Sequence, residues 1–147
     1  MRSLALSLVL VAGCAPPATP ARPGDVPRDT TEADAPDAPF ASEDDYRRQR
    51  AATRARLDEA VGQARASDVA QCRVAPITEQ ACGGPTAWAV YSAADGDAAV
   101  IEGLAARLVA LDVRANAQFG RVSTCVAYSP PEPVVRRGRC ADPNGAP

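Results

Sequence analysis

Five cysteines are the residues of this chain with the most chemistry open to them. A cysteine can form a disulfide, ligate a metal ion or act as a nucleophile. The chain contains no histidine, so it has neither the base of a Cys-His or Ser-His-Asp site nor an imidazole ligand for a metal. Four cysteines can pair with one another, and the fifth needs a separate explanation.

The first cysteine, Cys14, ends an N-terminal leader. Arg2 precedes an apolar run over residues 3–12 that is too short to span a bilayer, which takes about 20 residues as a helix. The run ends in Val11-Ala12-Gly13-Cys14, which resembles the bacterial lipobox. The resemblance implies that residues 1–13 are a signal peptide and that Cys14 becomes the acylated N-terminus of a lipoprotein. The alternative is an ordinary signal peptide that happens to contain a cysteine.

Acylation of Cys14 would fix the location of the protein. One acyl chain gives only marginal membrane binding, whereas two or three chains, palmitate among them, hold a protein stably. The residue after the cysteine is Ala15 rather than aspartate. The resemblance therefore implies sorting to the outer membrane of a two-membrane cell, facing the periplasm or the cell surface.

The other four cysteines are expected to form two disulfides, because the leader exports the chain to an oxidising compartment. They are Cys72, Cys82, Cys125 and Cys140. Three pairings are possible, and the sequence alone does not choose between them. We favour Cys72–Cys82 with Cys125–Cys140, because each pair flanks one local loop. Zinc is disfavoured because no tight CxxC pair is present, and we expect no metal and no cofactor.

Other side chains that could do chemistry are scattered along the chain. The acids nearest to predicted turns are Glu79, Asp95, Asp97 and Glu132. A pair of carboxylates would be needed for acid–base catalysis, and the spacing brings no two of these together. The run Arg136, Arg137 and Arg139 could hold phosphate or lipid A, or could protect an edge strand from aggregation.

Residues 14–42 are expected to be the lipidated cysteine followed by a disordered tether rich in proline and alanine, in which Phe40 is the only aromatic residue. A folded domain is expected over residues 43–147. That part carries equal numbers of arginines and acids, so it lacks the basic excess of a nucleic-acid binder.

Two helices are predicted in the folded part. Ser42 and the acids after it fit a helix start, and residues 43–66 are rich in helix formers. The second helix begins near Asp95 or Asp97 and ends at Gly120. Its apolar residues recur at three- and four-residue spacing: Val100, Ile101, Leu104, Leu108, Leu111 and Ala115.

Strands are predicted at residues 87–91, 122–128 and 134–137, where apolar residues cluster or alternate. The expected order is helix, short strand, strand, helix, strand, strand, which places one further short strand, without a range of its own, before the second helix. This order favours a small α+β domain with two helices and a short antiparallel sheet, stapled by disulfides over residues 72–140.

The segment Cys82-Gly83-Gly84-Pro85 carries a second resemblance. With Trp88, Tyr91-Ser92 and the other cysteines, it resembles a motif in small exported bacterial proteins of unestablished function, over residues 72–140. The chain departs from that motif in the two extra residues Thr86-Ala87. Gly83 and Gly84 permit a positive φ after the cysteine, and Pro85 stops the turn from extending. Trp88 and Tyr91 are expected in the core.

These observations favour a non-enzymatic, membrane-anchored envelope lipoprotein. Its domain is expected to bind another envelope protein or the cell wall, or to be a structural module. The alternative is a proteinase inhibitor that presents a disulfide-bounded loop, such as residues 73–81 or 128–139.

Overall fold

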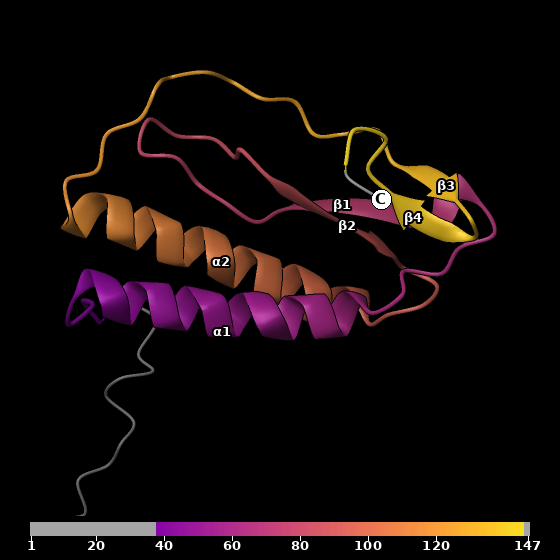
Figure 1. Cartoon of the computed structure of the whole chain (residues 1–147), viewed down its shortest axis with the longest axis horizontal. Helices are drawn as coiled ribbons and strands as arrows, with labels where there is room; N and C mark the ends of the chain where they lie inside the picture. The colour runs from indigo at the N-terminus through magenta and orange to yellow at the C-terminus, as the bar shows by residue number, and fades with distance from the viewer. Residues whose placement is uncertain (1–37, 146–147) are drawn as a thin grey trace, which may run out of the picture. The chain divides into compact units, whose positions relative to one another are not determined.

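A computed structural model describes residues 38–145. The predicted signal peptide, Cys14 and the predicted tether up to residue 37 lie outside the described residues. The order of elements is helix, strand, strand, helix, strand, strand, and the fold is α+β as predicted (Figure 1). The elements are α1 (Glu43–Val61), β1 (Cys72–Pro76), β2 (Trp88–Ser92), α2 (Ala98–Gln118), β3 (Val134–Arg136) and β4 (Arg139–Ala141), with a short 3-10 turn at Val69–Gln71.

Helix α1 begins where the sequence predicts and ends earlier. The Ser42 side chain accepts a hydrogen bond from the Asp45 N–H, and the Asp45 carboxylate accepts one from the Ala41 N–H. That backbone hydrogen bond holds the pKa of Asp45 below its usual value. The predicted end at residue 66 is wrong, because Gly62 takes a φ of 55° that breaks the helix just after Val61.

The chain after α1 is used to hold β4. The N–H of Cys140 donates to the Ala64 carbonyl at 2.8 Å, and the N–H of Ala66 donates to the Gly138 carbonyl at 2.9 Å. A helix that continued to residue 66, as predicted, would leave β4 without these two hydrogen-bond partners.

Helix α2 follows the predicted pattern closely. Asp97 caps it by accepting hydrogen bonds from the N–H groups of Ala99 and Val100. The predicted apolar residues are buried against α1 and the β1–β2 hairpin, with the exception of Val100, which is 49% exposed. Figure 1 shows α1 and α2 lying side by side with the hairpin along α2.

The strands form two separate two-stranded antiparallel sheets rather than one. In the first, β1 pairs with β2 so that Val74 lies opposite Val90; in the second, β3 pairs with β4. The predicted strand at 122–128 is wrong, since residues 121–133 contain no helix or strand. This segment connects the end of α2 to β3 along the length of the hairpin, and an extended chain spans that distance without pairing (Figure 1).

The core lies between the helices and the first hairpin. Its buried side chains include Leu57, Tyr91, Ile101 and Leu108. The Tyr91 hydroxyl donates to the Glu102 carboxylate at 2.6 Å, and burial together with this bond raises the pKa of Tyr91 to about 12. Trp88, predicted to be core, is only half-buried.

The folded domain starts before the predicted boundary at residue 43. Phe40, assigned by the sequence to the tether, is 4% exposed and packs with Tyr46, Leu111 and Phe119. An aromatic side chain of this size contributes strongly to a small core. The last residues of the predicted tether are therefore part of the domain.

Candidate binding face

The four cysteines of the described residues form the disulfides Cys72–Cys140 and Cys82–Cys125. The favoured local pairing, Cys72–Cys82 with Cys125–Cys140, is therefore wrong. Cys72 lies opposite Ser92 at the base of the β1–β2 hairpin, whereas Cys82 lies at the tip. An extended strand rises about 3.3 Å per residue, and a disulfide needs Cα atoms within about 7 Å, so the hairpin holds the two cysteines too far apart.

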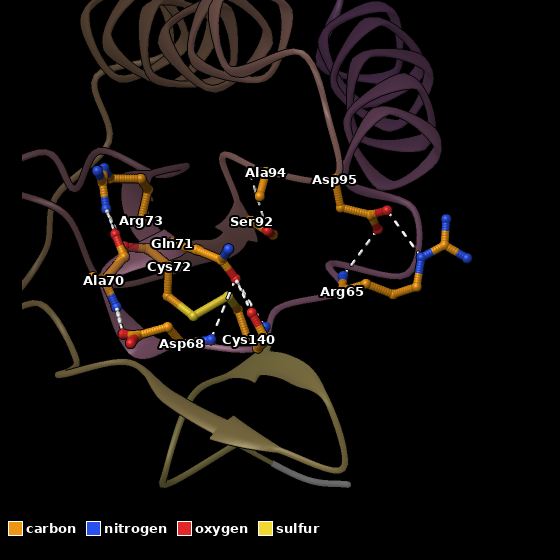
Figure 2. Close-up of a disulfide and its surroundings, with 11 residues drawn as sticks. Arg65, Asp68, Ala70, Gln71, Cys72, Arg73, Ser92, Ala94, Asp95 and Cys140 are labelled. Carbon is orange, nitrogen blue, oxygen red and sulfur yellow. Dashed lines mark hydrogen bonds and ion pairs between the residues drawn. A yellow bond between two sulfur atoms is a disulfide. The ribbon is translucent and has the colours of Figure 1, made fainter.

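Each disulfide instead closes one end of the hairpin. Cys72–Cys140 is buried and joins the base to β4 (Figure 2). Figure 2 also shows Arg65 beside this end of the hairpin. The Asp95 carboxylate accepts hydrogen bonds from the backbone N–H and from the Nε of Arg65. The backbone hydrogen bond holds the pKa of Asp95 below its usual value.

The hairpin tip, residues 77–87, is ordered by its own side chains. Gly83 and Gly84 have φ of 94° and 86°, as predicted for this turn. The Gly84 N–H donates to the Glu79 carboxylate at 2.6 Å. The Thr78 hydroxyl accepts from the N–H groups of Thr86 and Ala87. The tip is therefore a defined structure rather than a flexible turn.

Asp112 of α2 fixes the tip to the helices. It is 5% exposed, and it accepts hydrogen bonds from the Tyr46 hydroxyl, the Arg50 Nε and the Glu79 N–H. The Asn116 side chain donates to the Glu79 carbonyl. Burial and the bond to Asp112 raise the pKa of Tyr46, and the same carboxylate raises the pKa of Arg50.

The long loop, residues 121–133, is fastened to the hairpin tip at three points. Cys125 is bonded to Cys82, the Ser123 hydroxyl accepts from the Cys82 N–H at 3.0 Å, and the Gln80 amide donates to the Val126 carbonyl at 2.8 Å. All three contacts lie in the first half of the loop. Prolines at 130, 131 and 133 restrict the backbone of the second half.

The long loop presents large apolar side chains to solvent. Val122 is 93% exposed, Tyr128 51% and Val126 49%. Among residues 38–145, no backbone hydrogen bond joins residues 122–133 to another backbone group. The loop therefore offers both apolar contacts and unpaired N–H and C=O groups, which is what a strand-like partner can use.

Two hollows lie between the hairpin tip and the long loop. One of about 290 Å³ is bounded by residues 82–85 and 125–128. The other, of about 660 Å³, is bounded by residues 86–88, 129–132 and 142–144, and Trp88 lines it. The hairpin tip, the long loop and these hollows together are called the binding face below.

The candidate acids do not come together into one site. Glu79 accepts a hydrogen bond within the hairpin tip, and Asp95 accepts one from Arg65. Asp97 caps α2, whereas Glu132 lines the larger hollow. Within residues 38–145, no group of three or more Asp, Glu or Cys side chains is placed to hold a metal ion. In the same range, no helix has the length and apolar character needed to cross a bilayer.

Several residues that form or support the binding face were not predicted from the sequence. Ser123 and Gln80 belong to no sequence motif, because the Cys82–Cys125 disulfide determines which groups they can reach for a hydrogen bond. Asp112 did leave a signal: it is a carboxylate beside the apolar stripe of α2 at Leu108 and Leu111, and a buried carboxylate needs donors from elsewhere.

Comparison of the chain with protein-family models, with curated proteins and with solved structures finds no match to any of them.

Proposed function

We propose that this protein is an envelope lipoprotein, anchored through acylated Cys14, whose domain binds another envelope protein or the cell wall without catalysing a reaction. The observation that carries the binding role is the long loop, which is exposed yet held in place by Cys82–Cys125.

The anchor rests on the leader. Val11-Ala12-Gly13-Cys14 resembles the lipobox, and the two disulfides are suited to an oxidising compartment. Residues 15–37, rich in proline and alanine, would serve as a spacer between the anchor and the domain.

The binding role rests on preorganisation. A loop that is ordered before it binds loses less conformational entropy in the complex than a flexible one does. The long loop has exposed Val122, Val126 and Tyr128, and Trp88 lies beside the larger hollow. Large apolar side chains that an ordered loop leaves exposed are available for contact with a partner.

Intact mass spectrometry of the protein extracted from membranes tests the anchor. We expect a chain that begins at Cys14, carries acyl mass and has no free thiol. The matched variant Cys14→Ser should remain unacylated. A wild-type chain that begins elsewhere, or that lacks acyl mass, would refute the anchor.

Site-specific photocrosslinking in cells tests the binding role. A benzophenone amino acid at Tyr128 should give a discrete crosslinked species. The same probe at Ala55, on the exposed side of α1, is the matched control and should give only background. Equal background at both positions would count against the binding face.

A proteinase inhibitor is the second candidate, and the exposed long loop favours it. The rings suggested for it, residues 73–81 and 128–139, are not closed by the observed disulfides. The loop around Cys125 is nevertheless exposed and fastened in its first half, and such a segment can present an extended strand to a protease.

A panel of purified proteases distinguishes the two candidates. An inhibitor should reduce the activity of at least one protease while staying intact on both sides of Cys125. Cleavage within residues 121–133 without any inhibition would remove this candidate and leave the binding role as the only one.

A further inference from the structure

We propose that the β3–β4 hairpin carries a separate site for a phosphate-type anion, built from Arg136, Arg137 and Arg139. These three arginines line a pocket of about 560 Å³, and the chain from Cys140 to Asp142 together with Gly145 completes it. The binding face is built instead on the hairpin tip and the long loop. Asp142 lines both this pocket and the larger hollow of the binding face, so the two sites are neighbours, and the three arginines line only the anion pocket.

The pairing of the two strands sets like charges against each other. Arg136 lies directly opposite Arg139 in the β3–β4 register. Like charges on directly opposed residues destabilise an antiparallel pair of strands. Within residues 38–145, no carboxylate lies at ion-pair distance from Arg136, Arg137 or Arg139. A bound anion would remove this repulsion.

The turn between the strands is also strained. Arg137 and Gly138 have φ of 50° and 73°, the pattern of a turn that normally carries Asn-Gly. A long side chain such as arginine is uncommon at a positive φ, and strained residues of this kind cluster at ligand sites. The strain at Arg137 is a second observation, independent of the charge pattern.

The pocket is partly preorganised. Arg136 donates from Nη2 to the Pro143 carbonyl at 3.1 Å, which ties its guanidinium to the C-terminal turn. Asp142, the acid in the pocket wall, accepts a hydrogen bond from the Asn144 N–H at 2.8 Å. One guanidinium group can donate two parallel hydrogen bonds to two oxygens of a phosphate, so three guanidinium groups around one pocket suit a phosphate group in particular.

The other explanation for these arginines is that their charge protects an edge strand from pairing with a second chain. The two explanations predict different effects when the arginines are replaced. Edge protection predicts that removal of the charges leads to association and leaves phosphate binding unchanged. An anion site predicts that phosphate binding is lost.

The test uses the full chain with Cys14→Ser and both disulfides oxidised. Inorganic phosphate is titrated against sodium chloride of equal ionic strength, and the guanidinium Nε–H signals are followed by NMR. We expect saturable shifts for Arg136, Arg137 and Arg139. Arg136→Gln with Arg139→Gln should weaken binding at least fivefold, and Arg54→Gln with Arg56→Gln on α1, the matched control, should not.

A third variant separates the site from the fold. Arg137→Asn supplies the residue that the turn prefers, so the melting temperature should rise while phosphate binding weakens. Shifts that do not saturate, or equal affinity in the wild type and the Arg136/Arg139 variant, would overturn the proposal.

Vesicles identify the source of the phosphate group. Cosedimentation is compared for vesicles of phosphatidylcholine alone and for vesicles that also contain phosphatidylglycerol. Binding to the anionic vesicles that is lost in Arg136→Gln with Arg139→Gln assigns the site to a lipid headgroup. Binding of inorganic phosphate without vesicle binding assigns it to a free phosphate.

Discussion

Phe40 and Gln118 exchange two hydrogen bonds. The Phe40 N–H donates to the Gln118 Oε1 at 2.8 Å, and the Gln118 Nε2 donates to the Phe40 carbonyl at 2.7 Å. The same phenyl ring packs edge-on against Tyr46. These contacts join the residues before α1 to the end of α2, and they define where the folded domain begins.

The Phe40 contacts predict a stability loss in a segment that the sequence assigned to the tether. Phe40→Ala should lower the free energy of unfolding by about 3 kcal/mol, because a buried phenyl ring is removed and a cavity remains. Pro39→Ala, next to it and exposed, should change the free energy of unfolding by less than about 0.5 kcal/mol. Urea unfolding measures both, and equal effects would contradict the assignment of Phe40 to the core.

The disulfide pairing predicts specific linked peptides. Trypsin cuts after Arg73, Arg121 and Arg139, among other sites, and so separates all four cysteines. Under non-reducing conditions, residues 66–73 should be linked to 140–147, and residues 74–107 to 122–136. Mass spectrometry that finds 66–73 linked to 74–107 would contradict the pairing.

The buried carboxylate of Asp112 predicts a large effect of a small change. Asp112→Asn should lower the free energy of unfolding by about 3 kcal/mol, because the Arg50 charge loses its partner and an amide NH2 replaces one of the two carboxylate oxygens that accept hydrogen bonds. Asp58→Asn breaks the exposed pair with Arg54 and is the matched control, expected to cost less than about 0.5 kcal/mol. Urea unfolding of the two variants tests the difference, and a similar loss in both would mean that Asp112 is not a structural centre.

The raised pKa of Tyr91 predicts a loss of stability at alkaline pH. In the unfolded chain a tyrosine ionises near pH 10, whereas folded Tyr91 keeps its proton until about pH 12. The unfolded state therefore loses a proton first, and stability falls as the pH rises from about 10 to 12. Urea unfolding of the oxidised protein across this range should show the decline, and Tyr91→Phe should make it shallower. An identical decline in Tyr91→Phe would exclude Tyr91 as its source.

Much of the fold could be predicted because local signals agree with it. Asp97 as a cap and the spacing of Ile101, Leu104 and Leu108 specify α2 almost completely. Ser42 likewise specifies the start of α1. Caps and apolar periodicity are local properties of a helix, so a single sequence contains them.

Two of the errors come from interactions that are remote in sequence. Alternation at residues 122–128 predicted a strand, but a strand also needs a pairing partner, and residues 122–128 pair with none of the described strands. The cysteines were paired by nearness in sequence, whereas the rigid hairpin separates Cys72 from Cys82. Both errors affect the binding face, because the long loop and the Cys82–Cys125 disulfide are parts of it.

The central claim is that Cys82–Cys125 holds the long loop in a form ready to bind. Photocrosslinking at Tyr128 should therefore be compared between the wild type and the double variant Cys82→Ser with Cys125→Ser. Circular dichroism should show that the double variant, which keeps the buried Cys72–Cys140 disulfide, is still folded. We predict a crosslinking yield at least fivefold lower in the variant that lacks this disulfide. An unchanged yield in a folded variant would contradict the account.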